Sequence, residues 1–168
     1  MRTFSKLLAV SALTALWVLA APGEARAQEC SAKVSAAFKG QLIVTANQLD
    51  LGGDAADVIA SIRKKNLTVL KHDDGEDGPV WGFYFTAFMN RTPGAKAVSL
   101  DFYTDDSQHR YAANKRLEGI DPHARLLQHN ILISEDDGLD VGKRYLVKLT
   151  ASAGGHDVVL ATTKLTVR

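Results

Sequence analysis

The chain has 168 residues, with 20 Lys and Arg against 19 Asp and Glu, and its formal net charge is +1. A charge this balanced lacks the basic surface by which proteins bind nucleic acid or an anionic membrane, so we expect neither partner. After its apolar N-terminal stretch, the sequence contains no run of residues apolar enough to span a bilayer.

Residues 1–27 have the pattern of a cleaved secretory signal peptide. A basic start precedes an almost unbroken apolar run from Leu7 to Ala21, and the small residues Ala25 and Ala27 stand at the two positions that a signal peptidase reads. We therefore expect the mature protein to be exported to the periplasm or to the cell exterior, without a membrane span.

Cys30 is the only cysteine of the chain. A single thiol cannot close an internal disulfide, so the stability of the domain must come from its core. We expect Cys30 to be an unreactive thiol on a flexible N-terminal arm, residues 28–38, ahead of one domain spanning 39–168. Pairing between two molecules and metal capture are the alternatives.

The first part of the domain predicts a strand and then a short helix. Residues 41–47 alternate in the manner of a strand, and Asp54 is a suitable N-cap for a helix over 54–65. An apolar stripe with helical spacing follows the cap, formed by Ala55, Val58, Ile59 and Ile62. A helix this short needs a surface to pack on.

Short strands account for most of the remaining sequence. A turn at Pro93-Gly94 predicts that strands 80–89 and 98–103 form a hairpin, and 105–123 is expected to be an irregular loop with one helical turn. Further strands are expected at 67–70, 126–133, 145–151 and 159–167. About seven strands with one accessory short helix predict an all-β fold, an antiparallel β-sandwich.

The sequence Leu-Asp-Val-Gly-Lys-Arg-Tyr-Leu-Val-Lys-Leu-Thr-Ala occupies residues 139–151. It resembles the strand E-to-F corner of fibronectin type III and related immunoglobulin-like domains, which reads Leu-x-Pro-Gly-x-x-Tyr-x-Val-x-Val. The resemblance covers the C-terminal half only. It implies that Tyr145 is the buried ring of a tyrosine corner, bonded to upstream backbone, and that Gly142 is the turn residue. It implies an immunoglobulin-like architecture and no function.

The last predicted hairpin, with Tyr145 and then Ser-Ala-Gly-Gly-His ending at His156, is also similar to the end of periplasmic CopC-type copper-binding sandwiches. That family binds copper through an N-terminal histidine and through the Asp and His of this turn. His156 matches, but Gly154 replaces the aspartate. We therefore expect no cofactor. Metal binding, of copper or calcium, by His156 with Cys30, other histidines or an acidic turn is the alternative.

Two features favour a surface for a partner. Strand 80–89 is apolar on both faces, and Tyr84 and Phe88 lie on the face opposite to the core; either the helix covers them or they bind a partner. The expected loop at 105–123 carries Arg110, Lys115 and Arg116, which are suited to an anionic partner such as a glycan or carboxylate, unless the loop is simply solvated.

No sequence pattern specifies a reaction. The chain lacks the Gly-x-Ser-x-Gly elbow of hydrolases, a glycine-rich phosphate loop and closely spaced zinc ligands. We therefore expect a non-catalytic binding or structural module that contacts an envelope protein or a cell-surface polymer. A periplasmic metal-binding protein and a hydrolase whose site forms only in the fold are the alternatives.

Overall fold

The computed structural model describes residues 30–75, 78–153 and 155–168. The expected signal peptide lies outside these residues. About half of the described residues are in strands, which confirms the all-β class. The elements are, in chain order, α1 (Ala32–Ala37), β1 (Gln41–Thr45), α2 (Ala55–Lys65), β2 (Val69–Leu70), β3 (Asp73–Gly75), β4 (Gly78–Phe88), β5 (Ala97–Thr104), β6 (Tyr111–Glu118), β7 (Leu126–Ser134), the 3-10 turn η1 (Glu135–Asp137), β8 (Arg144–Ala153) and β9 (His156–Val167).

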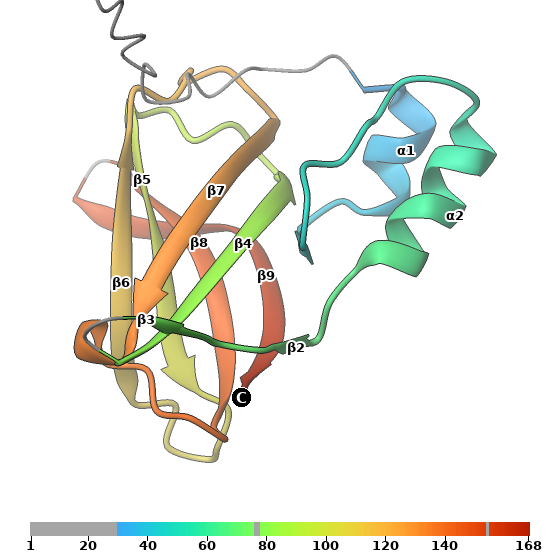
Figure 1. Cartoon of the computed structure of the whole chain (residues 1–168). Helices are drawn as coiled ribbons and strands as arrows, with labels where there is room; N and C mark the ends of the chain where they lie inside the picture. The colour runs from blue at the N-terminus through green and yellow to red at the C-terminus, as the bar shows by residue number, and fades with distance from the viewer. Residues whose placement is uncertain (1–29, 76–77, 154) are drawn as a thin grey trace, which may run out of the picture.

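The described strands form one continuous sheet, which curls around a core as an open half-barrel (Figure 1). The strand order is β3-β4-β1-β9-β8-β5-β6, with β7 on the other edge of β4 and β2 beside β9. Most neighbours are antiparallel, but β1 and β2 both pair with β9 in parallel. The sheet is therefore mixed and continuous, in contrast to the two antiparallel sheets of the expected sandwich.

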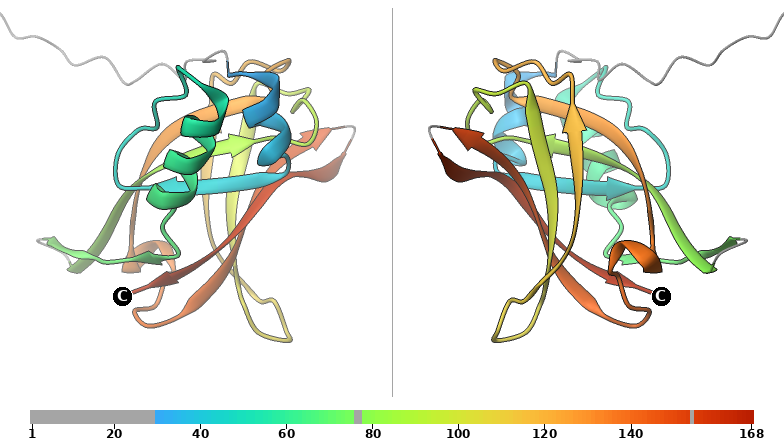
Figure 2. Two further views of the ribbon diagram at one scale, coloured as in Figure 1. Left: turned by 90° about the vertical axis from the view of Figure 1, so that its right-hand side faces the viewer. Right: turned by 90° about the vertical axis from the view of Figure 1, so that its left-hand side faces the viewer.

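The two parallel pairings follow from the path of the chain through α2. Gln41 of β1 pairs with Thr162, and Val69 of β2 pairs with Thr166, so β1 and β2 occupy successive stretches of the same edge of β9. Between the two strands the chain leaves the sheet, forms α2 on its outside and rejoins the edge of β9 at β2 (Figure 2).

The expected hairpin between β4 and β5 is wrong. In the described part of the chain β4 pairs with β1, β3 and β7, whereas β5 pairs with β6 and β8. Pro93 is buried, and the Gly94 N–H donates to the carbonyl of Pro122 at 3.0 Å. The Pro93-Gly94 segment therefore belongs to the connection between β4 and β5, which is hydrogen-bonded to the segment before β7.

The expected loop at 105–123 also contains a long strand. Residues 111–118 form β6, antiparallel to β5. Their sequence has few of the β-branched residues that favour strands, and only Ala113 and Leu117 of β6 are fully buried. Pairing with β5 therefore decides the conformation of this segment, because strand preference depends strongly on context.

The core fills the inside of the curl, and alternation in the sequence identifies its lining correctly. Side chains on the predicted inner faces are buried. They include Trp81, Phe83, Phe85, Ala87 and Met89 of the predicted strand 80–89, Val98, Leu100 and Phe102 of β5, and Tyr145, Val147 and Leu149 of β8. The opposite faces of β5 and β8 therefore point away from the core.

A second apolar cluster lies outside the sheet, under the two helices. Figure 2 shows α1 and α2 packed together in front of β1. Val58 and Ile62 of α2 are buried against Ile43 and Phe88 of the sheet. The helix therefore covers the second apolar face of β4 at Phe88, as the apolar stripe predicts.

The segment expected to be a flexible arm contributes to the same cluster. Residues 32–37 form α1, and the Ser31 hydroxyl caps it by accepting a hydrogen bond from the Val34 N–H at 3.3 Å. Val34 and Phe38 are buried, and the Phe38 ring lies 5.3 Å from that of Phe88. Burial of these side chains on the sheet stabilises a helix too short to form alone.

A candidate binding groove on the outer face of the sheet

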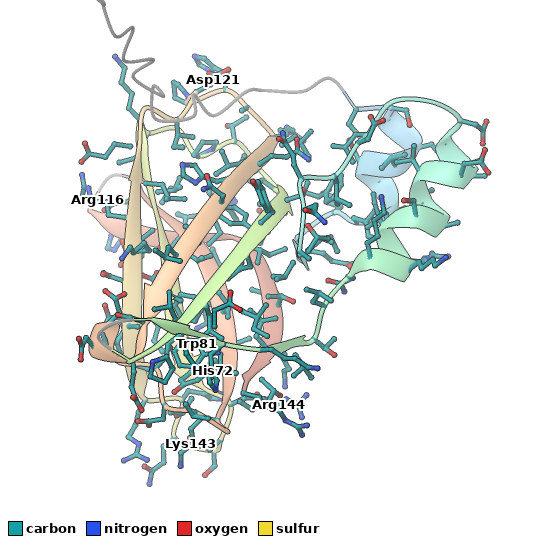
Figure 3. The ribbon with its side chains drawn as sticks, viewed as in Figure 1. His72, Trp81, Arg116, Asp121, Lys143 and Arg144 are labelled. Carbon is teal, nitrogen blue, oxygen red and sulfur yellow. The ribbon has the colours of Figure 1, made fainter. Side chains whose placement is uncertain are left out.

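A groove of about 700 Å³ lies on the outer face of β5, β6 and β8. Because β5 sends Leu100 and Phe102 into the core, the alternate residues Ser99, Asp101 and Tyr103 point outward and line the groove. β6 and β8 contribute polar side chains on either side of them, and Asp157 of β9 completes the lining. The groove lies outside the curl of the sheet, on the side of the molecule opposite the helices (Figure 3).

Asp101 forms the centre of the groove floor. Its register partners are Asn114 on β6 and Lys148 on β8. Although it faces outward, Asp101 is only 9% exposed. One carboxylate oxygen accepts a hydrogen bond from the Ser99 hydroxyl at 2.6 Å, and the other accepts from the Thr150 hydroxyl at 2.7 Å. The two hydroxyls fix the plane of the carboxylate.

Neighbouring cations do not neutralise this carboxylate. Among the described residues, no basic nitrogen lies within 4.0 Å of the Asp101 carboxylate. The Arg116 Nε pairs with Glu118 at 3.1 Å, and the Lys148 Nζ lies 4.4 Å from the centre of the Tyr103 ring. Asp101 therefore presents acceptor oxygens that its own hydroxyl partners only partly occupy, since a carboxylate has about four acceptor positions.

Two tyrosines form an aromatic wall at one end of the groove. Tyr103 and Tyr111 are register partners, and their rings meet edge to face with centroids 5.8 Å apart. Burial and the nearby charge of Asp101 raise the pKa of the Tyr103 hydroxyl, which therefore stays a neutral donor at physiological pH. Tyr111 is 57% exposed, an open amphipathic ring of the kind enriched at interfaces.

A β-bulge brings Tyr111 to this face. Ala113 of β6 pairs with Phe102, but the next residue of β5, Tyr103, pairs with Tyr111, so Ala112 is an extra residue on β6. Without the bulge, the alternation of the strand would send Tyr111 to the opposite face from Asn114. The aromatic wall therefore depends on a local irregularity that the sequence pattern does not reveal.

The three basic residues expected to share one loop are separated by the strand that they occupy. Arg110 lies exposed just before β6, and Arg116 lines the groove. Figure 3 shows Arg116 on the side of the sheet away from the helices. Lys115 faces the opposite way, and its Nζ lies 3.4 Å from the carboxylate of Asp137. Adjacent residues of a strand point to opposite faces, so these three side chains form no single basic surface.

The other expected partner surface is reduced to one side of β4. Phe88 is 2% exposed beneath the helices, so it does not form a partner surface. Tyr84 is 36% exposed, and Leu132 of β7 is 64% exposed. Leu132 pairs with Gly82, one outward-facing position along β4 from Tyr84. This apolar patch is small and lies on β4 and β7, whereas the groove lies on β5, β6 and β8.

The structure does not bring the expected metal ligands together. His156 lies exposed at the turn between β8 and β9, whereas Cys30 precedes α1 and packs against the apolar cluster beneath the helices. These two regions are on opposite sides of the molecule (Figure 1). Over the described ranges, no three His, Cys, Asp or Glu side chains gather in a way that could hold a metal ion.

Of the residues expected to form the tyrosine corner, Gly142 lies in the turn before β8 and Tyr145 is the second residue of β8. Tyr145 is fully buried, and Gly142 has a φ of +83°, in the left-handed region that favours glycine. The Gly142 N–H donates to the carbonyl of Val167 at 2.8 Å, which joins the turn to the last strand.

No family model, curated protein or solved structure matches this chain. In the part of the chain that the structure describes, no helix has the length and apolar character needed to cross a membrane. The sequence contains the groove residues but offers one hint of them only, an acid at position 101 on the polar face of an otherwise apolar strand.

Proposed function

We propose that this protein is an exported, non-catalytic binding module of the periplasm or cell exterior, which contacts an envelope protein or a cell-surface polymer through the groove on β5, β6 and β8. The observation that carries the proposal is the combination of a fixed carboxylate, Asp101, with an exposed aromatic ring, Tyr111, in one concavity. Binding sites are typically concave, of about 300–1,000 Å³, with a few positioned polar groups.

The geometry at Asp101 supports a binding function. Ser99 and Thr150 hold its two oxygens from either side, so the carboxylate is fixed as an acceptor for hydrogen-bond donors of a ligand. Tyr111 adds apolar area at a small entropic cost, because a tyrosine ring has few rotatable bonds. Both features stabilise a bound surface without requiring a chemical step.

We also propose a distant relationship to fibronectin type III and other immunoglobulin-like domains. The hydrogen bond from the Asp140 N–H to the buried Tyr145 hydroxyl supports it, because a tyrosine corner makes such a contact at the same place in the sequence pattern.

Site-specific photo-cross-linking in intact cells tests the binding function. A benzophenone amino acid in place of Tyr111 should form a cross-linked adduct of discrete composition with a protein or polymer of the envelope. The matched control carries the same group in place of Tyr84, an exposed tyrosine of β4 that does not line the groove. Absence of any adduct from position 111, or the same adducts from both positions, would refute the groove as the binding surface.

A further inference from the structure

We infer that the ligand of the groove is a neutral oligosaccharide or a segment of a polysaccharide. This inference rests on the binding function proposed above and specifies the chemical class of the partner. Three properties of the groove carry it: the acceptors on its floor, its free aromatic face and the arrangement of its charges.

The floor of the groove is suited to hydroxyl donors. Each oxygen of the Asp101 carboxylate accepts one hydroxyl from the protein, Ser99 on one side and Thr150 on the other. Each oxygen has a further acceptor position, so the carboxylate can receive two hydroxyls from neighbouring carbons of a sugar ring. Asn114, which is the register partner of Asp101 on β6, adds an amide that both donates and accepts.

The aromatic wall provides a flat apolar face beside these acceptors. Tyr103 packs edge-on against Tyr111 and fixes its orientation, while Tyr111 itself remains 57% exposed. A pyranose ring presents hydroxyls at its edge and C–H groups on its face. It can therefore lie against an amphipathic aromatic ring while its hydroxyls reach a polar floor. The Tyr103 ring is already covered by the Lys148 ammonium, so Tyr111 is the free platform.

The charges of the groove disfavour both kinds of ionic ligand. A polyanion would meet the carboxylates of Asp101 and Asp157, and the Arg116 charge is already paired with Glu118. An amine ligand would meet Lys96 and Arg116, which line the same groove, and Lys148 already occupies the cation site over the Tyr103 ring. A neutral polyhydroxylated chain satisfies the same acceptors without either conflict.

The volume of the groove indicates a chain of several sugar units. About 700 Å³ is more than a single sugar ring fills, and the lining extends across β5, β6 and β8 from Lys96 to Tyr111. We therefore expect affinity to increase with the number of sugar units until the groove is filled.

The test is a titration of the isotope-labelled protein, expressed with its own N-terminal segment and purified. The probes are neutral hexasaccharides of glucose, N-acetylglucosamine, mannose and xylose. NMR and calorimetry measure their binding. Heparin oligosaccharide and the hexamer of glucosamine are the anionic and cationic comparisons. We expect at least one neutral probe to shift the ring resonances of Tyr103 and Tyr111 and to bind more tightly than its disaccharide.

Two single substitutions connect binding to the groove. Tyr111→Ala should weaken the affinity for that probe at least about tenfold, because the stacking surface is lost. Tyr84→Ala removes an exposed tyrosine of β4 that does not line the groove and should leave the affinity unchanged. Because both side chains are exposed, both variants should fold. Asn114→Ala, at the groove floor, is a third variant and should also weaken the affinity.

If no neutral probe shifts the ring resonances of Tyr103 and Tyr111 at millimolar concentration, the inference is overturned. Binding of only the heparin or glucosamine oligomer would also overturn it, as would equal loss of affinity in Tyr111→Ala and Tyr84→Ala. The proposed binding function is separable from these results. If an envelope protein is still cross-linked at position 111, the groove is a binding surface for a partner of another class.

Discussion

The backbone N–H of Asp140 donates a hydrogen bond of 2.8 Å to the hydroxyl oxygen of Tyr145. The Tyr145 ring is buried and meets that of Phe102 edge to face, with centroids 6.4 Å apart. Burial raises the pKa of the Tyr145 hydroxyl, so the phenol stays neutral at physiological pH. This contact joins the connection before β8 to the start of that strand and to the core.

Replacement of Tyr145 by Phe tests this contact. The substitution retains the ring and leaves the Asp140 N–H without its acceptor, which should cost about 1 kcal/mol of unfolding free energy. Urea denaturation measures the change, and Tyr84→Phe on the exposed face is the control. An unchanged midpoint for Tyr145→Phe would show that the hydroxyl contributes nothing to the corner.

Gly138 lies close to the backbone of β6, so its substitution should destabilise the protein. Its φ is +106°, and a Cβ there would lie 2.5 Å from the carbonyl oxygen of Ala112 on β6. Gly138→Ala therefore combines left-handed strain with a backbone clash, and we expect a loss of more than about 2 kcal/mol.

Gly142→Ala is the matched control for Gly138. Gly142 has a φ of +83°, but a Cβ there would meet no atom within 4 Å. It should lose only the conformational part, about 1 kcal/mol. Equal losses in the two variants, measured by thermal or urea denaturation, would contradict the close approach of Gly138 to β6.

Asp105 should make the protein less stable in acid. Its carboxylate lies 2.9 Å from the Lys164 Nζ and 2.9 Å from the Arg144 Nε. The hydrogen bond from Lys164 and the nearby positive charges lower the pKa of Asp105. A lowered folded-state pKa stabilises the protein above the unfolded-state pKa, near 3.9, and this contribution is lost as the pH falls through the folded-state value.

We therefore expect the unfolding free energy to decrease below about pH 4, and to decrease less steeply in Asp105→Asn. Urea denaturation across the acid range measures both slopes. Asp57→Asn, on the exposed face of α2, is the control. Part of the acid dependence should remain in Asp105→Asn, because hydrogen bonds also lower the pKa values of Asp106 and Asp137. Parallel curves for wild type and Asp105→Asn would contradict the prediction.

The N-terminal helix should belong to the cooperative unit of the fold. Phe38 is buried against Phe88, so Phe38→Ala should cost about 3–5 kcal/mol. Calorimetric unfolding measures the loss, and Lys39→Ala, the exposed neighbour, should be nearly silent. If Phe38→Ala were also silent, α1 would be peripheral, as a flexible arm would be.

The alternation of side chains along strands and the residues of local turns could be predicted from the sequence. The faces of β4, β5 and β8, the N-cap at Asp54 and the buried ring of Tyr145 depend on residues close together in the chain. The polar face of β5 was predictable in the same way, including the outward direction of Ser99, Asp101 and Tyr103. These features depend on the period of two residues in a strand and on the side chains that cap helices and turns.

The sequence pattern did not predict which strands pair with one another. Short strands of similar composition can pair in many orders, so the pattern did not reveal that β5 joins β6 and β8 instead of β4. α1 was missed because Val34 and Phe38 form too short a periodic pattern to indicate a helix without the sheet beneath them.

By itself, the sequence determined which residues prefer strands, which side chains face the core, and where Tyr145 and the α2 stripe are buried. Only the tertiary structure decided the curled order of the strands, the bulge at Ala112 and the hydroxyl pair around Asp101, and hence the groove. The physical reason is that side-chain alternation is a local property of the backbone, whereas a binding surface needs residues from three strands in one register. That register is set by packing of the whole core.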